Sequence, residues 1–446
     1  MDIHERIEKE EAKLKIIVNK ALDYVEKKHV DQALISVVKS TGLTTSVRNQ
    51  ETNEVKFSKR RDFSVTMWND HHKGSASTTD LSDDAIFSTL DAAIDISKHT
   101  ESDIYNGLAD DEDLQREFTD FDTFYPEEPN PEAQIARSME LEKMCISHEK
   151  IKQCNSASVN SGYGQSIFAT TEGQFYTVKG SYFSDSISLT AEENDQMEQG
   201  GSYHFTYTSR NRWKLEDMMK EALNETIPNL GAQKIQTQTL PVIFDKDVSP
   251  NIFYWLISGL EGQGQYKKTS YLNDCLGETI LPEWLTVLED PYMMHEMASS
   301  CVDSSGSKTI KRDIVTNGKV ASYILSAYSA RQLKMKNTGN GNGTYNWLVT
   351  NSGISRKELE KKMDTGLIIK DMMGFGLDPL TGDVSVGVRG FMVEHGEVTY
   401  PVKEITIAGN AREMLKNIVA ISNDIDPESS IKTGSILIDA IKIAGK

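Results

Sequence analysis

Residues 373–409 read MGFGLDPLTGDVSVGVRGFMVEHGEVTYPVKEITIAG and alternate apolar with polar side chains over two long runs. A period of two is typical of β-strands that bury one face. His395-Gly396 separates the two runs, in the position that the central residues of a tight hairpin turn take. Asn317-Gly318 lies in the same way between two shorter alternating runs. The pattern predicts a β-rich C-terminal domain with a few helices over residues 233–446.

The first part of this predicted domain has a different hydrophobic pattern from the two alternating runs. LPVIF, residues 240–244, predicts a short buried strand, and SPNIFYWLISGLEG, residues 249–262, predicts a helix. Ser249 is placed to cap this helix, with Pro250 in its first turn.

The N-terminal half combines helices with antiparallel meanders. Residues 2–28 predict an amphipathic helix capped by Asp2, and a second helix is expected after Ser82. Polar residues divide the β-rich stretch between them, which predicts four short strands: 33–40, 44–50, 54–59 and 63–69. The predicted fold class is α+β. Its predicted parts are an N-terminal α+β domain at 1–100, an acidic connector at 101–130, a central helix and β-meander domain at 131–232, and the C-terminal domain at 233–446.

The composition restricts the classes of partner. The 446 residues include 48 Lys and Arg and 67 Asp and Glu, a net charge of −19. This balance argues against binding to nucleic acid or to an anionic membrane surface, since both require a basic surface. No apolar run is long enough to span a bilayer, and the charged N-terminus has no signal-peptide core. The four cysteines show no regular spacing, so we expect a cytoplasmic protein without a disulfide framework.

His295-Glu296 is a candidate fragment of a catalytic motif. It looks like the first half of a zinc-peptidase helix, in which a second histidine follows about one turn later. The positions four and five residues on hold Ser299 and Ser300. His4-Glu5 and His148-Glu149 repeat the dipeptide, which indicates chance. Neither a GxSxG nucleophile motif nor a phosphate-binding loop occurs.

Four long segments, residues 72–82, 311–347, 365–425 and 434–445, resemble the TldD/PmbA metalloprotease family. Their order and spacing match specifically the PmbA (TldE) subunit of that family. The resemblance implies a bacterial cytoplasmic peptidase system of two homologous subunits that trims leader peptides or degrades small unfolded proteins. TldD-like chains carry HExxxH on a helix and bind the catalytic zinc. PmbA-like chains pair with them and generally lack these ligands, and an older name of the family is modulator of DNA gyrase.

The same resemblance locates the position of the missing zinc motif in this chain. GLEG, residues 259–262, matches the end of the zinc helix, so Phe253 stands at the first histidine, Tyr254 at the glutamate and Ser258 at the second histidine. No cysteine follows Cys301. We therefore expect no metal and no catalytic residue in this chain, which would be the non-catalytic subunit, with zinc in a TldD-like partner.

The glycine-rich C-terminal segments lead to a hypothesis about the peptide substrate. Backbone groups in 338–347 and 372–391 are candidates to pair with an extended peptide on its way to the zinc of the partner. The alternative is that these glycines only form turns inside a β core. The candidate channel residues are Thr338, Gly339, Asn340, Gly341, Gly374, Gly376 and Gly387.

Two other functions remain open from the sequence. The chain is alternatively a non-enzymatic homodimeric adaptor that binds peptides or proteins, which the absence of an HExxxH homologue in the same genome would favour. The third possibility is a self-sufficient peptidase with an unrecognised metal site.

Overall fold

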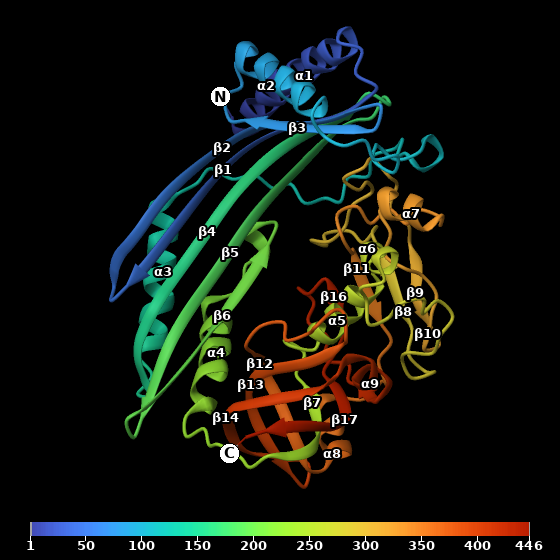
Figure 1. Ribbon diagram of the computed structural model, residues 1–446. Coiled ribbons are helices and arrows are strands. Elements are labelled where there is room, and N and C mark those ends of the chain that lie inside the picture. Colours follow the sequence, from blue (N-terminus) through green and yellow to red (C-terminus); the bar gives the residue numbers. More distant parts are fainter. Residues whose placement is uncertain (1, 446) are drawn as a thin grey trace. The chain divides into compact units, whose positions relative to one another are not determined.

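A computed structural model describes residues 2–445. The chain forms two compact units. The N-terminal unit comprises the residues up to Leu230 together with Ser304–Ser307, and the C-terminal unit comprises Gly231–Asp303 and the residues from Lys308 onward. Helices and mainly antiparallel sheets occur in both units (Figure 1), which confirms the predicted α+β class.

The N-terminal unit is built on one six-stranded antiparallel sheet with the order β3-β2-β1-β4-β5-β6. The four short strands predicted at its start are wrong, because 33–40 and 44–50 belong to one strand and 54–59 and 63–69 to another. The polar residues between them stay in the ladder, with Thr41 opposite Lys59 and Gly42 opposite Ser58. The strands are β1 Gln32–Arg48, β2 Glu51–Asn69, β3 His72–Thr78, β4 Ile151–Thr170, β5 Phe175–Glu193 and β6 Gln196–Thr206.

Two pairs of helices cover one face of this sheet, one pair near each end. Val37 packs in a core with α1 and α2, whereas Thr45 donates a hydrogen bond to Gln134 of α3. Residues 37 and 45 of β1 differ by an even number and so point to the same face. The second core joins α3 and α4 to β4 and β5. The helices are α1 Ile3–Lys27, α2 Asp83–Ser97, α3 Pro131–Ile146 and α4 Leu215–Thr226, with short 3₁₀ turns at Asp111–Asp113, Ser209–Asn211 and Ile227–Asn229.

The caps of the first two helices differ from each other. Asp2 caps α1 as predicted, since its carboxylate accepts from the Ile3 N–H at 2.7 Å. Ser82 does precede α2, but its hydroxyl makes no capping hydrogen bond. The acidic residues Asp83 and Asp84 in the first turn supply favourable charge at that helix N-terminus instead.

The acidic connector, residues 101–130, runs along the N-terminal unit with almost no regular structure of its own. Its backbone nevertheless forms hydrogen bonds with other segments of the unit. Ala109 donates to Ser305 at 2.9 Å, and Ser181 of β5 donates to the Thr123 carbonyl at 3.0 Å. The first bond fixes the first half of the connector, and the second bond attaches its second half to β5.

The C-terminal unit contains two sheets. The six-stranded sheet has the order β14-β13-β12-β7-β17-β15, and β14 also pairs with β17, so five of its strands close into a barrel. Asn317-Gly318 and His395-Gly396 form tight hairpin turns with positive φ, as predicted. The other sheet has the order β10-β9-β8-β11-β16.

The strands of the C-terminal unit are β7 Gln238–Phe244, β8 Val287–Asp290, β9 Arg312–Thr316, β10 Lys319–Val320, β11 Asn346–Val349, β12 Gly366–Met372, β13 Asp383–Glu394, β14 Glu397–Asn410, β15 Ile418–Ile421, β16 Ile431–Lys432 and β17 Ile436–Ala444. Its helices are α5 Pro250–Leu260, α6 Gly262–Lys267, α7 Ala327–Leu333, α8 Arg356–Met363 and α9 Ala411–Lys416. One large hydrophobic core includes residues of both sheets and of α5.

Candidate functional site

Helix α5 occupies the position that the sequence resemblance assigns to a zinc helix. It begins at Pro250, whose fixed φ suits a first helical turn. Ser249 precedes it as expected, but the predicted cap is wrong, because its hydroxyl donates to the carbonyl of Lys246 at 3.2 Å. Apolar residues fill most of the helix, so it is held by packing and not by a polar cap.

The three motif positions of α5 face different surroundings. Phe253 is fully buried in the large core of the C-terminal unit, whereas Tyr254 is 40% exposed and Ser258 is half-buried. A phenyl ring has no donor atom for a metal, and phenol and serine hydroxyls are not bases near neutral pH. These three side chains therefore do not fit a zinc site.

A loop at residues 373–382 packs against α5. The indole N–H of Trp255 donates to the carbonyl of Phe375 at 2.9 Å, and the Tyr271 hydroxyl donates to the carbonyl of Trp255 at the same distance. The Tyr271 N–H in turn donates to the carbonyl of Pro379 at 2.9 Å. The loop is thus fixed to the helix directly through Trp255 and indirectly through Tyr271, while the side chains of Met373 and Phe375 are 66% and 44% exposed.

The glycines of this loop and of β13 lie close together. The Ser385 N–H donates to the carbonyl of Gly376, and the Met373 N–H donates to that of Gly387, both at 2.8 Å. Gly374 and Gly376 have φ of +102° and +68°, a region that favours glycine. A Cβ at Gly376 would lie 2.5 Å from Cβ of Val386. Gly376 therefore forms a tight turn, and the half-buried Gly387 lies beside Met373.

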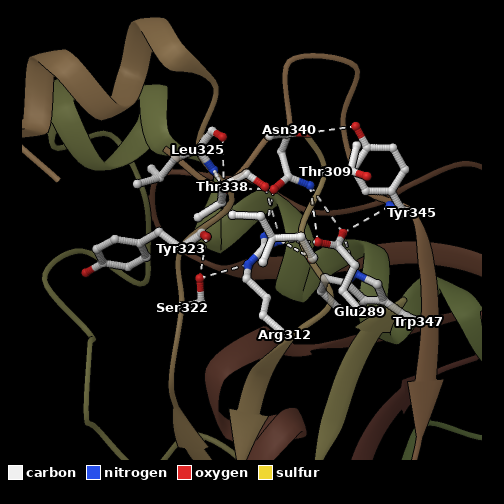
Figure 2. Close-up of polar contacts among 12 residues, drawn as sticks. Glu289, Thr309, Arg312, Ser322, Tyr323, Leu325, Thr338, Asn340, Tyr345 and Trp347 are labelled. Atoms are coloured by element: carbon white, nitrogen blue, oxygen red, sulfur yellow. Dashed lines mark hydrogen bonds and ion pairs between the residues drawn. The ribbon is translucent and has the colours of Figure 1, made fainter. Parts of the chain in front are cut away.

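The other channel candidates lie elsewhere in the C-terminal unit, around a buried carboxylate on β8. Figure 2 shows Glu289, which is completely buried, bonded to Arg312 of β9 and to Asn340. One carboxylate oxygen accepts from the Arg312 guanidinium at 2.5 Å. The other accepts from the Tyr345 N–H at 3.0 Å and from the Trp347 indole at 3.2 Å. Burial lowers the pKa of Arg312, and the adjacent Glu289 opposes this shift.

The segment 338–341 is part of this network. The Thr338 hydroxyl accepts from the Leu325 N–H at 2.7 Å, and the Asn340 side chain accepts from Arg312 at 2.7 Å (Figure 2). The carbonyl of Gly339 accepts from the Tyr345 hydroxyl at 2.6 Å. Thr338, Gly339 and Asn340 are buried, whereas Gly341 is half-buried and donates its N–H to Asp303 at 2.8 Å. Their polar groups are engaged within the chain.

Glu289 and Arg312 were missed by the sequence analysis. The available signal was an acidic residue inside VLED, residues 287–290, a short strand with apolar residues before it. A charge within a buried strand needs a partner. The sequence gives no indication that this partner lies 23 positions away.

His295-Glu296 lies in a turn and not on a helix. His295 has a φ of +62°, and the Glu296 carboxylate accepts from the Lys432 ammonium group at 2.8 Å. Over residues 2–445 no three His, Cys, Asp or Glu side chains are grouped so as to hold a metal ion. Nor does any helix in these described residues have the length and apolarity needed to cross a membrane.

Solved structures share this fold and define its class. A protein of Bacteroides thetaiotaomicron, described as a modulator of DNA gyrase, superposes with a TM-score of 0.91 at 22% identity and covers 97% of this chain and 99% of its own. TldE from Thermococcus kodakarensis superposes with a TM-score of 0.83 at 18% identity, covering 96% and 100%. At these identities the similarity concerns the fold.

Sequence comparisons then identify the family. The PmbA/TldA metallopeptidase models match as domain 1 at residues 33–97, the central domain at 124–230 and the C-terminal domain at 237–445. Metalloprotease PmbA of Escherichia coli O157:H7 is 37% identical over 447 residues, which cover 100% of this chain and 99% of that protein. The chain belongs to the PmbA/TldD metallopeptidase family, as its motifs predicted, and to the PmbA (TldE) branch.

Relatives of both branches occur in one organism. In Buchnera aphidicola subsp. Acyrthosiphon pisum, a Metalloprotease PmbA homolog is 34% identical and covers 100% of both chains. A Metalloprotease TldD homolog of the same organism is 25% identical and covers 60% of both chains.

Proposed function

We propose that this chain is the non-catalytic, PmbA/TldE-like subunit of a cytoplasmic zinc-dependent peptidase complex. A TldD-like subunit with the HExxxH motif would supply the zinc and the base, and the substrates would be leader peptides or small unfolded proteins. The proposal rests on one observation. In this member of a metallopeptidase family, the motif positions of α5 hold Phe253, Tyr254 and Ser258 in place of the zinc ligands and the base. The presence of both branches in one organism supports the pairing.

The chemistry of peptide hydrolysis divides naturally between two such subunits. Zinc hydrolysis needs a metal-bound water, a base and an oriented peptide bond. This chain lacks groups for the first two at the motif positions, but it can contribute to orientation. Tyr254, Met373 and Phe375 have exposed side chains on two segments that are joined by the hydrogen bond from Trp255 to Phe375. Each of these apolar side chains is accessible to a peptide or a partner subunit.

The first test is the peptidase activity of the chain alone and of the complex. We expect the purified chain to leave an unstructured peptide intact in the presence of zinc, and the chain co-purified with a TldD-like subunit to cleave it. Native mass spectrometry should give the 49.9 kDa chain plus a partner of similar size, with zinc retained by the partner. A zinc-free homodimer without a partner would favour the adaptor, and chelator-sensitive cleavage by the chain alone would overturn the proposal.

The channel hypothesis is retained for the exposed segment around Gly374, Gly376 and Gly387, and for Gly341. Thr338, Gly339 and Asn340 would act through the buried network that supports Gly341. The contacts of the glycines allow a matched comparison of two substitutions.

Gly387→Ala is expected to fold and to lower peptide turnover by the complex. Its Cβ would lie 3.3 Å from the sulfur of Met373, a flexible side chain that can move. Gly376→Ala is expected to lower the free energy of unfolding by about 1–3 kcal/mol, because its backbone has a positive φ. Urea titration and peptide turnover by the assembled complex measure the two effects. Full turnover with Gly387→Ala would indicate that this glycine only shapes the β core.

A further inference from the structure

The second strand of the N-terminal unit has a long unpaired edge. β2 pairs with β1 along its whole length, but β3 pairs only with Phe63–Asn69, so it lies beside one end of β2 alone (Figure 1). No strand in residues 2–445 pairs with the outer side of 51–62. Every residue from Glu51 to Arg61 is exposed. The outward N–H and C=O groups of this segment are therefore available to another chain.

The edge is regular and firmly held. Its bulge is confined to Asn53, and from Glu54 to Asp62 the register with β1 is uninterrupted. The hairpin turn at Asn49 and Gln50 is bound by Glu142 of α3, a fully buried carboxylate. It accepts from the two backbone N–H groups at 2.7 and 2.6 Å. A partner strand would meet an edge that is already ordered, which reduces the entropic cost of binding.

A cavity of about 400 Å³ lies next to this edge. Strands β1, β2 and β4 form its floor, and the first turns of α1 and the end of the acidic connector form its walls. Phe57 of β2 and Phe124 of the connector are two of its apolar lining residues. Phe57 is 58% exposed and belongs to both the edge and the cavity, so the two features are continuous.

The lining of this cavity has a net positive charge, whereas the whole protein has a net negative charge. Five cationic side chains line it against two carboxylates, in a chain of net charge −19. The carboxylates are already engaged, Glu128 with Arg6 at 2.6 Å and Glu10 with Lys39. The remaining three cations come from β2: Lys59, Arg60 and Arg61.

The cations of β2 have little compensation within the chain. Arg60 is 3.9 Å from Asp62, and Lys59 and Arg61 have no ion-pair partner among the described residues. Arg61 also stands directly opposite Lys39 in the ladder, and like charges in that position repel. An anionic ligand would relieve this repulsion and would be attracted by the local field.

We propose that the edge Glu54–Asp62 and the adjoining cavity bind an extended acidic segment of another protein. The main chain of that segment continues the sheet beyond β2, and its carboxylates contact Lys59 and Arg61. A strand explains the use of the unpaired backbone, which a nucleic acid does not need. A second copy of this chain would instead bring Lys56, Lys59, Arg60 and Arg61 of both copies to one interface, against only Glu54 and Asp62 of each copy in the same stretch. The inference does not depend on the proposed peptidase role.

The charge component is tested by fluorescence anisotropy with a labelled ten-residue peptide of alternating Glu and Thr. We expect at least roughly tenfold weaker binding for the Gln-Thr peptide, and the same loss with Lys59→Glu/Arg61→Glu. The matched control, Lys357→Glu/Lys362→Glu on the exposed face of α8, changes the net charge equally and should keep the affinity. Equal losses in both variants would overturn the proposed site.

The main-chain component is tested with two N-methylated versions of the same peptide, each blocking alternate amides. One version should lose binding and the other should keep it, because only alternate amides face the neighbouring strand. Equal binding of both would exclude strand pairing. Tighter binding of a single-stranded RNA ten-mer would overturn the choice of ligand. A dimer in sedimentation that Lys59→Glu/Arg61→Glu dissociates would instead identify a second copy as the occupant.

Discussion

Replacement of Glu289 by alanine is expected to lower the free energy of unfolding by about 3–5 kcal/mol, because it leaves a buried guanidinium without its counter-charge. The Arg312 side chain is 12% exposed, and Glu289 also accepts bonds from Asn340, Tyr345 and Trp347. The loss therefore combines an unpaired cation with several unsatisfied donors. A urea titration followed by circular dichroism measures it.

Two further variants make the Glu289 result interpretable. Glu289→Gln keeps the size of the side chain and an acceptor oxygen, so it should be less destabilising than alanine. Glu283→Ala removes an exposed acidic residue from the same region and should change the stability by no more than about 0.5 kcal/mol. Wild-type stability of Glu289→Ala would mean that the network contributes nothing to the fold of the C-terminal unit.

The second large effect is expected at the motif position of α5 that lies in the core. Phe253→Ala should lower the free energy of unfolding by about 3–5 kcal/mol, because it leaves a cavity where a fully buried ring was packed. Tyr254→Ala on the same helix should cost less than about 1 kcal/mol, since that side chain is 40% exposed. Thermal unfolding of the two variants side by side gives the comparison.

The comparison of Phe253→Ala with Tyr254→Ala also separates effects on stability from effects on peptide turnover or partner binding. Under the proposed function, Tyr254→Ala folds normally but weakens peptide turnover or partner binding, whereas any loss with Phe253→Ala follows from its instability. Similar stability of the two variants would show that α5 is not packed as described.

The sequence correctly predicted elements that depend on residues close together in the chain, such as tight turns and an amphipathic helix. The turns at Asn317-Gly318 and His395-Gly396 form as predicted because asparagine, histidine and glycine accept a positive φ. The amphipathic pattern of α1 buries Leu14 and Val18 as expected. The prediction that a strand ends near Thr41 was wrong. A polar residue in a long ladder keeps its backbone hydrogen bonds when the neighbouring strands extend past it.

Contacts between distant segments left no local trace in the sequence. The pairing of β1 with β4 joins residues more than a hundred positions apart, and the barrel closes through β14 and β17. The same holds for the candidate site. Resemblance placed Phe253, Tyr254 and Ser258 on one helix, but the differing exposure of the first two depends on packing that periodicity alone did not resolve. The glycine-rich stretch at 338–341 was proposed from the sequence to pair with an extended peptide or to form turns in a β core. Its polar groups are engaged in bonds within the chain.

The full burial of Phe253 limits which residues this position can hold in members of the family. An exposed position tolerates single substitutions by many residue types. A histidine at position 253 would instead place ring nitrogens in a closely packed apolar core. The resemblance implies that a TldD-like chain carries a histidine at this position. We therefore expect the neighbours of α5 to differ between the two branches together with the motif itself.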